Sequence, residues 1–110
     1  MKWNQLTDVN QLTDILKNSH VKAQVIFKHS TRCSISSVAL NRFKNVDNPD
    51  NIDFYLLDLI EHRSLSNTVA DVFKVHHESP QVLMIVNNDC IYDESHLSIS
   101  IKDLFEQVQA

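Results

Sequence analysis

Cys33 is the residue of this chain best placed to do chemistry. It follows an apolar run at residues 25–27 and precedes a helical pattern, so it falls where a strand ends and a helix begins. A helix N-terminus carries about half a positive charge and several unpaired N–H groups, and both favour a thiolate over a thiol. Arg32, His29 and Lys28 add positive charge nearby. These features predict a reactive thiolate. The alternative, a buried structural cysteine, is disfavoured because residues 29–32 and 34 are polar.

Ser36 stands where a CxxC motif would place its second thiol. Without a neighbouring resolving thiol, a mixed disulfide on Cys33 has to be released by another molecule, so we expect a monothiol exchange. Ser34 and Ser36 could donate hydrogen bonds to the thiolate, and they could equally be ordinary polar residues of a first helical turn. A dithiol mechanism is disfavoured by Ser36 alone.

The hydrophobic pattern around this site predicts four helices and four strands. The expected order is a helix at residues 7–17, a strand at 21–28, a helix at 35–43, a strand at 52–59, a helix at 64–73, strands at 82–86 and 90–92, and a helix at 101–108. The expected helix caps are Thr7 or Asp8, Ser64 and Ser100. The apolar faces expected on the helices include Val9, Leu12, Ile15 and Leu16, then Ile35, Val38, Ala39 and Phe43, then Leu65, Val69, Val72 and Phe73, and finally Ile101, Leu104, Phe105 and Val108.

This order predicts one α/β domain over residues 1–110. A strand–helix–strand unit calls for a parallel, right-handed crossover, and a hairpin through Asn87, Asn88 and Asp89 then adds an antiparallel pair. The expectation is a four-stranded mixed sheet with helices on both faces. The chain has no glycine, which excludes the phosphate-cradling loops of P-loop and Rossmann domains.

Two segments resemble the signatures of a known family. The stretch Phe27-Lys28-His29-Ser30-Thr31-Arg32-Cys33-Ser34-Ile35-Ser36 and the stretch His76-His77-Glu78-Ser79-Pro80-Gln81-Val82 are similar to those of the YtxJ-type bacilliredoxins. These are monothiol thioredoxin-fold proteins of bacteria that use bacillithiol. The resemblance extends over nearly the whole chain, to Ser95-His96. The family more often has proline after its cysteine, where this chain has Ser34, and that departure bears on thiol acidity and redox poise.

The resemblance implies a thioredoxin-like fold and a specific activity. The first strand would be central, and Ser79–Pro80 would be a cis peptide facing Cys33, with the Ser79 backbone free to pair with an incoming chain. Cys33 would be the catalytic residue that takes bacillithiol from mixed disulfides on oxidised proteins, before a reducing partner regenerates it. Bacillithiol would be a thiol co-substrate, with no other cofactor. The residues expected to bind substrate are Thr31, Arg32, Ser34, Ser36, Ser79 and Pro80.

Cys90 is the other thiol, and we expect no redox role for it. If Pro80 lies near Cys33, the strand that follows leads away at about 3.3 Å per residue, which puts Cys90 roughly 15–20 Å off. The six histidines form no recognised metal pattern, so no metal site is expected. His76 or His77 could line the substrate groove, or each could be a solvated loop residue.

A basic cluster lies around the motif. Lys28, Arg32, Arg42 and Lys44 could attract the malate carboxylates of bacillithiol. They are equally compatible with a solvated surface whose charge helps Cys33 to ionise.

Composition bounds the remaining possibilities. The net charge of −4 gives no field that favours nucleic acid, and the longest apolar run, residues 82–86, is far too short to span a bilayer. No basic, apolar and small-residue pattern marks a secretory leader, so we expect a cytoplasmic monomer whose partners are bacillithiolated proteins and a small thiol.

A second hypothesis is a redox-responsive binding module that becomes thiolated at Cys33. Turnover separates the two, because a module would be modified once and stay modified.

Overall fold

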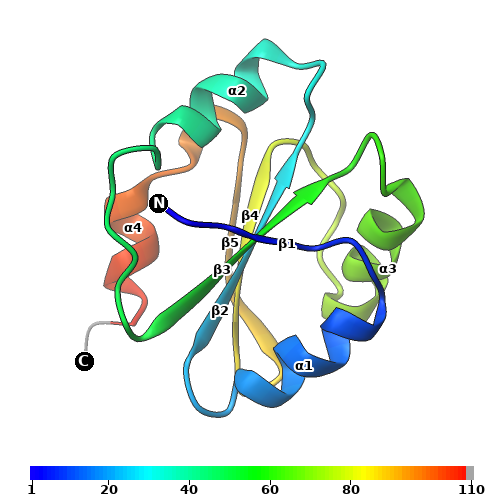
Figure 1. Ribbon diagram of the computed structural model, residues 1–110, viewed down its shortest axis with the longest axis vertical. Coiled ribbons are helices and arrows are strands. Elements are labelled where there is room, and N and C mark those ends of the chain that lie inside the picture. Colours follow the sequence, from blue (N-terminus) through cyan, green and yellow to red (C-terminus); the bar gives the residue numbers. More distant parts are fainter. Residues whose placement is uncertain (109–110) are drawn as a thin grey trace.

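The computed structural model describes residues 1–108, which fold around a five-stranded mixed sheet (Figure 1). The strand order across the sheet is β1-β3-β2-β4-β5. β1 and β2 both pair in parallel with β3, and β4 runs antiparallel to β2 and to β5. The strands are β1 (Asn4–Gln5), β2 (Ala23–His29), β3 (Ile52–Asp58), β4 (Gln81–Val86) and β5 (Asp89–Ser95).

Helices cover both faces of the sheet (Figure 1). The first face carries α1 (Asn10–Asn18) and α3 (Arg63–Phe73); the second carries α2 (Ser34–Asn41) and α4 (Ile101–Glu106). Successive strand residues point to opposite faces, so Ile26 joins the apolar cluster under α1 and α3, and Phe27 joins the cluster under α2 and α4. β2 is buried along its whole length because helices cover both faces of the sheet at this central strand. Within residues 1–108, no helix is long and apolar enough to cross a membrane.

The sequence predicts four strands, and the structure has five. The additional strand, β1, consists of Asn4 and Gln5, which pair with Tyr55 and Leu56 at the outer edge of β3. Both β1 residues are polar and exposed. No alternation of apolar side chains marks such a short segment as a strand, so the hydrophobic pattern could not reveal it.

Several predicted helix faces and caps need correction. Val9, Ile35, Val38 and Val72 are all exposed rather than packed on the core. The caps of α1 and α3 are Val9 and His62, in place of Thr7 or Asp8 and of Ser64, and Val108 lies beyond the end of α4. The stripe on α2 is turned because Ser36, rather than an apolar residue, shares the buried face with Ala39.

Two local predictions are confirmed. Ser100 caps α4, where its Oγ atom accepts the N–H of Asp103 at 3.3 Å. The β4–β5 hairpin turns through Asn87 and Asn88, both with positive φ (50° and 71°), a region that asparagine tolerates better than most residues.

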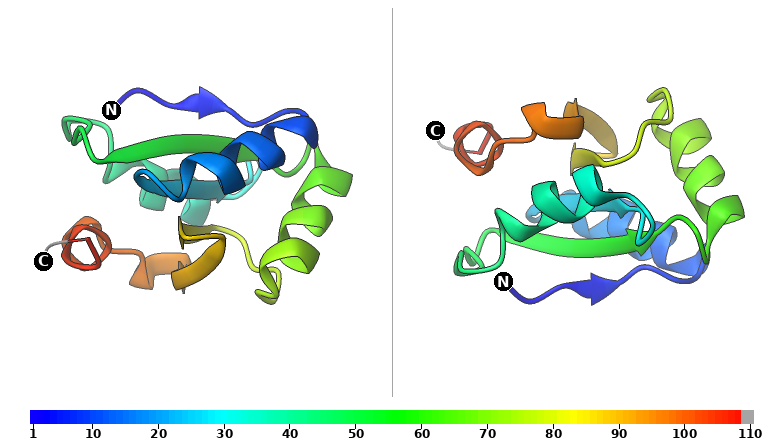
Figure 2. Two further views of the ribbon diagram at one scale, coloured as in Figure 1. Left: turned by 90° about the horizontal axis from the view of Figure 1, so that it is seen from below. Right: turned by 90° about the horizontal axis from the view of Figure 1, so that it is seen from above.

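Three segments meet where β2 and β3 end and β4 begins (Figures 1 and 2). His29 pairs with Asp58 across β2 and β3, and Lys28 pairs with Gln81 across β2 and β4. Residues 30–33, residues 59–62 and residues 74–80 extend from these strand ends, so they lie at the same margin of the sheet. We call this margin the Cys33 edge.

Candidate active site

Cys33 is the N-cap residue of α2. Its backbone is extended (φ −115°, ψ 120°), its N–H donates to the carbonyl of Ser30 at 3.2 Å, and its carbonyl accepts the N–H of Ser37 at 3.2 Å. An N-cap side chain is placed to accept the backbone N–H groups of the first helical turn. The thiol of Cys33 is partly exposed, and it occupies this N-cap position without making a side-chain capping hydrogen bond. This geometry suits a thiolate, because the helix dipole and the open N–H groups both act on negative charge there.

Ser36 lies one turn further along α2 and is completely buried. Its Oγ atom accepts the N–H of Ser30 at 3.0 Å and lies 2.6 Å from the Nδ1 atom of His29. Burial lowers the pKa of His29, and the carboxylate of Asp58 opposes this shift. These contacts tie the start of α2 to the end of β2, and they hold the turn that carries Cys33.

Lys28 has no exposed surface, although its side chain ends in an amine. Its Nζ atom donates to the carbonyl of Ser66 on α3 at 3.1 Å and lies 3.2 Å from the Nδ1 atom of His77. Burial lowers the pKa of Lys28 from 10.5 to about 8. The pKa of His77 is also lowered, first by burial and then by the charges of Lys28 and Arg63. Lys28 therefore links β2, α3 and residues 74–80 beneath the Cys33 edge.

Ser79 and Pro80 lead into β4 at the same edge, and the peptide bond between them is cis. Pro80 is buried, and its carbonyl accepts the N–H of His96 at 2.9 Å. The side chain of Gln81 holds the preceding segment by donating to the carbonyl of His76 at 3.0 Å. The Oγ atom of Ser79 is buried and has no hydrogen-bond partner within residues 1–108.

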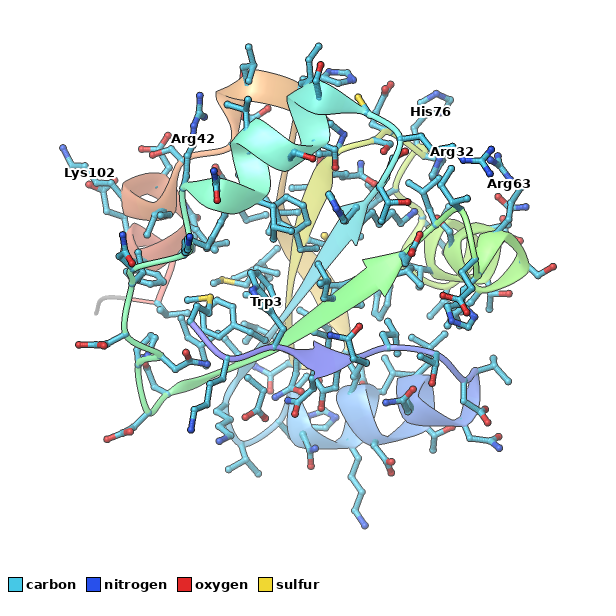
Figure 3. All side chains as sticks on the ribbon, turned by 45° about the horizontal axis from the view of Figure 1, so that its top comes forward. Trp3, Arg32, Arg42, Arg63, His76 and Lys102 are labelled. Atoms are coloured by element: carbon cyan, nitrogen blue, oxygen red, sulfur yellow. The ribbon has the colours of Figure 1, made fainter. Side chains whose placement is uncertain are left out.

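The remaining residues that the sequence singles out divide into two groups. Thr31, Arg32 and Ser34 flank Cys33 and are exposed, so an incoming molecule can reach them. Arg42 points away from the site, because its guanidinium donates to the carbonyls of Leu97 and Ile99 at 2.8 and 2.7 Å. Figure 3 shows Arg32 at the upper right, at the Cys33 edge, and Arg42 at the upper left, at the far end of α2.

Cys90 lies far along the sheet from this edge. It pairs with Ile85, four residues beyond Gln81, which corresponds to about 13 Å at the spacing of a strand. Its Sγ atom donates to the carbonyl of Tyr92 at 3.3 Å, and burial raises its pKa to about 11. Among residues 1–108, Cys33 and Cys90 are both free thiols, and no group of three metal-ligating side chains comes together.

Sequence reasoning missed two features of the site. The contact of Lys28 with Ser66 and His77 joins residues 38 and 49 positions apart, so no local spacing could indicate it. Arg63, the first residue of α3, was not singled out, and Figure 3 places it beside Arg32 and His76. A basic residue at the start of a helix interacts unfavourably with the positive end of the helix dipole. This unusual position is the one sequence signal that could have drawn attention to Arg63.

The fold and the position of Cys33 define a thioredoxin-fold protein with a cysteine at the start of the helix after the central strand. The chain is similar to the solved structure of a candidate oxidoreductase with a thioredoxin fold, at 28% identity and a TM-score of 0.82, over 96% of this chain and 92% of that one. It is also similar to Malassezia sympodialis thioredoxin (17% identity, 96% and 87% covered, TM-score 0.74) and to thioredoxin f from spinach chloroplast (14% identity, 98% and 91% covered, TM-score 0.74).

Within this class, the chain belongs to a particular family. The family model described as monothiol bacilliredoxin BrxC matches residues 4–104. Family membership and the thioredoxin fold together support a thiol redox function, and the range that matches includes both Cys33 and the Ser79–Pro80 segment.

Proposed function

We propose that this protein is a YtxJ-type monothiol bacilliredoxin that removes bacillithiol from protein mixed disulfides through Cys33. The observation that carries the proposal is the pairing of a partly exposed N-cap cysteine with a buried serine one turn later. Cys33 can attack a disulfide, and Ser36 cannot resolve the product. This arrangement fits a protein that accepts a thiol group and passes it to another molecule.

The proposed exchange is a single displacement at sulfur. The Cys33 thiolate attacks the bacillithiol sulfur of the mixed disulfide and forms a new disulfide with it. The bond between bacillithiol and the substrate protein breaks, and its electron pair leaves with the protein sulfur, which then takes a proton from water. The first-turn N–H groups of α2 stabilise the attacking thiolate, and the start of the helix holds it in one place.

The surroundings of Cys33 support a protein substrate. The backbone of Ser79 can accept an extended chain by strand addition, with Pro80 beside it. Ile35, Val38 and Leu97 are apolar and between 43% and 51% exposed, and α2 packs against η1 (His96–Ser98), so these side chains lie on one surface next to Cys33. Thr31, Arg32 and Ser34 would contact the mixed disulfide itself, while Ser36 would act from beneath by holding the turn.

We infer that the protein works as a single-domain monomer in the cytoplasm, where thiols are kept reduced. Bacillithiol is a co-substrate of this reaction, and no other cofactor is invoked. The Cys33–bacillithiol disulfide is resolved by a second thiol or a reducing partner, because Cys90 is too far away and its raised pKa keeps it protonated.

Intact-mass analysis after mixing with a bacillithiolated protein tests the proposal. Wild type and the matched control Cys90→Ala should each gain one bacillithiol while the substrate protein loses it, and Cys33→Ala should do neither. With excess reduced bacillithiol, a small amount of wild type should clear many equivalents of substrate. If the label stays on the substrate although Cys33 is reduced, the proposal is wrong. A single modification without turnover would favour the thiolated binding module instead.

A further inference from the structure

Basic side chains lie at the Cys33 edge on three separate parts of the chain. Arg32 precedes Cys33 in the β2–α2 loop, Arg63 begins α3, and His76 lies in residues 74–80. All three side chains are exposed. Figure 3 shows them projecting at the same edge, and the ribbon views in Figures 1 and 2 place their three segments together.

Asp58, Glu61 and Glu78 are the acidic residues of the same segments, and the carboxylates of Asp58 and Glu78 are engaged elsewhere. Glu78 is shared between His76 at 3.8 Å and His96 at 3.4 Å. The carboxylate of Asp58 accepts the N–H groups of Ile60 and Glu61 at 3.0 and 3.4 Å. Within residues 1–108, neither Arg32 nor Arg63 has a carboxylate in ion-pair contact.

The positive charge at this edge also acts on His77, which is half-buried. After burial, the charges of Lys28 and Arg63 are the largest causes of its lowered pKa, and Glu78 opposes them. Arg63 and Lys28 therefore both act on the region around His77. An anion at this edge could bind the guanidinium groups of Arg32 and Arg63, each of which can hold a carboxylate in a bidentate manner.

We propose that Arg32 and Arg63 form an anion subsite beside Cys33 that binds the carboxylates of the small thiol carried by the mixed disulfide. This inference rests on the proposed function and deepens it. It adds Arg63, which no motif singled out. It replaces the predicted contributions of Arg42 and Lys28, because two carbonyls hold Arg42 at the far end of α2 and Lys28 is buried.

The subsite has a chemical consequence, since a mixed disulfide contains two sulfur atoms that Cys33 can attack. Attack on the sulfur of the small thiol releases the protein thiol and leaves the small thiol on Cys33. Attack on the protein sulfur releases the small thiol and links Cys33 to the protein instead. Holding the carboxylates of the small thiol at Arg32 and Arg63 keeps its sulfur next to Cys33, so the subsite directs the first of these two reactions.

Three mixed disulfides of one carrier protein test the subsite by charge alone. The small thiols are mercaptosuccinate, with two carboxylates, mercaptoethanol, which is neutral, and cysteamine, which is a cation. The variants are Arg32→Glu, Arg63→Glu and, as matched control, Lys102→Glu, an exposed lysine on α4 at the far side of the molecule (Figure 3). Each variant changes the charge by the same amount. Rates are measured at low and high salt, and intact mass identifies which half of the disulfide Cys33 retains.

Wild type and Lys102→Glu should react about tenfold faster with the mercaptosuccinate disulfide than with the cysteamine disulfide at low salt, and added salt should reduce that preference. Arg63→Glu and Arg32→Glu should abolish or reverse the preference, which is measured as the ratio of the mercaptosuccinate rate to the cysteamine rate within each variant so that a general change in Cys33 reactivity cancels. Both variants should also increase the fraction of Cys33 linked to the carrier protein.

Two results would overturn the subsite. One is equal rates of wild type with all three disulfides. The other is a ratio of mercaptosuccinate rate to cysteamine rate that stays at the wild-type value in both arginine variants, whatever their overall rates. The absence of exchange with these three disulfides and also with a bacillithiolated carrier protein would instead refute the proposed function.

Discussion

The Nδ1 atom of His29 lies 2.6 Å from the Oγ atom of Ser36, at the position where a dithiol protein would have its second sulfur. The same oxygen accepts the N–H of Ser30, so the Ser36 hydroxyl joins the end of β2 to the turn before Cys33. Burial lowers the pKa of His29, which favours its neutral imidazole. Ser36 thereby supports the turn of Cys33 from below.

Replacing Ser36 with alanine should destabilise the fold. The Ser36→Ala variant leaves the N–H of Ser30 and the Nδ1 atom of His29 buried without a partner, which costs about 1–3 kcal/mol of unfolding free energy. Urea denaturation measures the change. Ser37→Ala is the matched control, because Ser37 is exposed and its hydroxyl makes only a 3.4 Å contact with the carbonyl of Cys33. Equal stability of the two variants would contradict the role given to Ser36.

Lys28, which is buried, and His77, which is half-buried, form the second contact of the site, at 3.2 Å. The pKa of Lys28 is about 8 in the folded protein and 10.5 when unfolded, so the unfolded chain binds more protons between these pH values. Stability contributed by Lys28 therefore rises with pH through this window, by up to about 3 kcal/mol.

The Lys28→Met variant isolates this effect from the titration of Cys90 and the tyrosines, whose raised pKa values act in the opposite direction. Wild type should gain stability relative to Lys28→Met as the pH rises from about 8 to about 10. Denaturation with urea at several pH values measures the difference. A constant difference across the range would mean that Lys28 does not titrate in this window.

Cys33 and Cys90 should react with iodoacetamide at very different rates. Burial raises the pKa of Cys90 to about 11, so about one thousandth of it is thiolate near pH 8, and its side chain is also shielded. Mass spectrometry of partly alkylated protein should show Cys33 modified first, by at least about tenfold. Unfolding in urea should remove the difference, which serves as the control. Comparable labelling in the folded state would place Cys90 in contact with solvent.

The position of the nucleophile could be predicted from sequence because it depends on local patterns. The apolar run before residue 28 and the helical spacing after residue 34 place Cys33 at a strand–helix junction without any knowledge of the tertiary structure. The hairpin at Asn87 and Asn88 is local in the same sense. The cis bond at Ser79–Pro80 came from the family resemblance, since the dipeptide alone indicates it weakly.

Other features depend on partners that are distant in sequence. The strand character of Asn4 and Gln5 comes from β3, fifty positions along the chain, and their own side chains carry no signal. From the sequence alone, Lys28 would be predicted to be an exposed cation. In the folded protein its amine contacts Ser66 and His77. Arg42 is likewise part of the basic cluster predicted from sequence. In the structure its guanidinium donates to the carbonyls of residues 97 and 99, so it does not reach the site.

The N-terminal segment should stabilise the active-site strand through Trp3. Its ring makes edge contacts with Phe27, Phe43 and Phe54 at centroid distances of 5.8, 5.6 and 5.7 Å. Phe27 precedes Lys28 on β2, so these contacts support the strand that carries the site. Trp3→Ala should lower the unfolding free energy by about 3 kcal/mol, through lost burial and lost aromatic contacts.

Trp3→Phe is the conservative variant and should recover more than half of this loss, because one ring can still reach the aromatic cluster. Val21→Ala, at a side chain that is 86% exposed, is the control for a general effect of truncation and should stay within about 0.5 kcal/mol of wild type. Thermal unfolding followed by far-ultraviolet circular dichroism compares the variants without relying on tryptophan fluorescence. If Trp3→Ala unfolds with the wild-type midpoint, the segment before β1 contributes nothing to the core, and the contacts of Trp3 with Phe27 do not support β2.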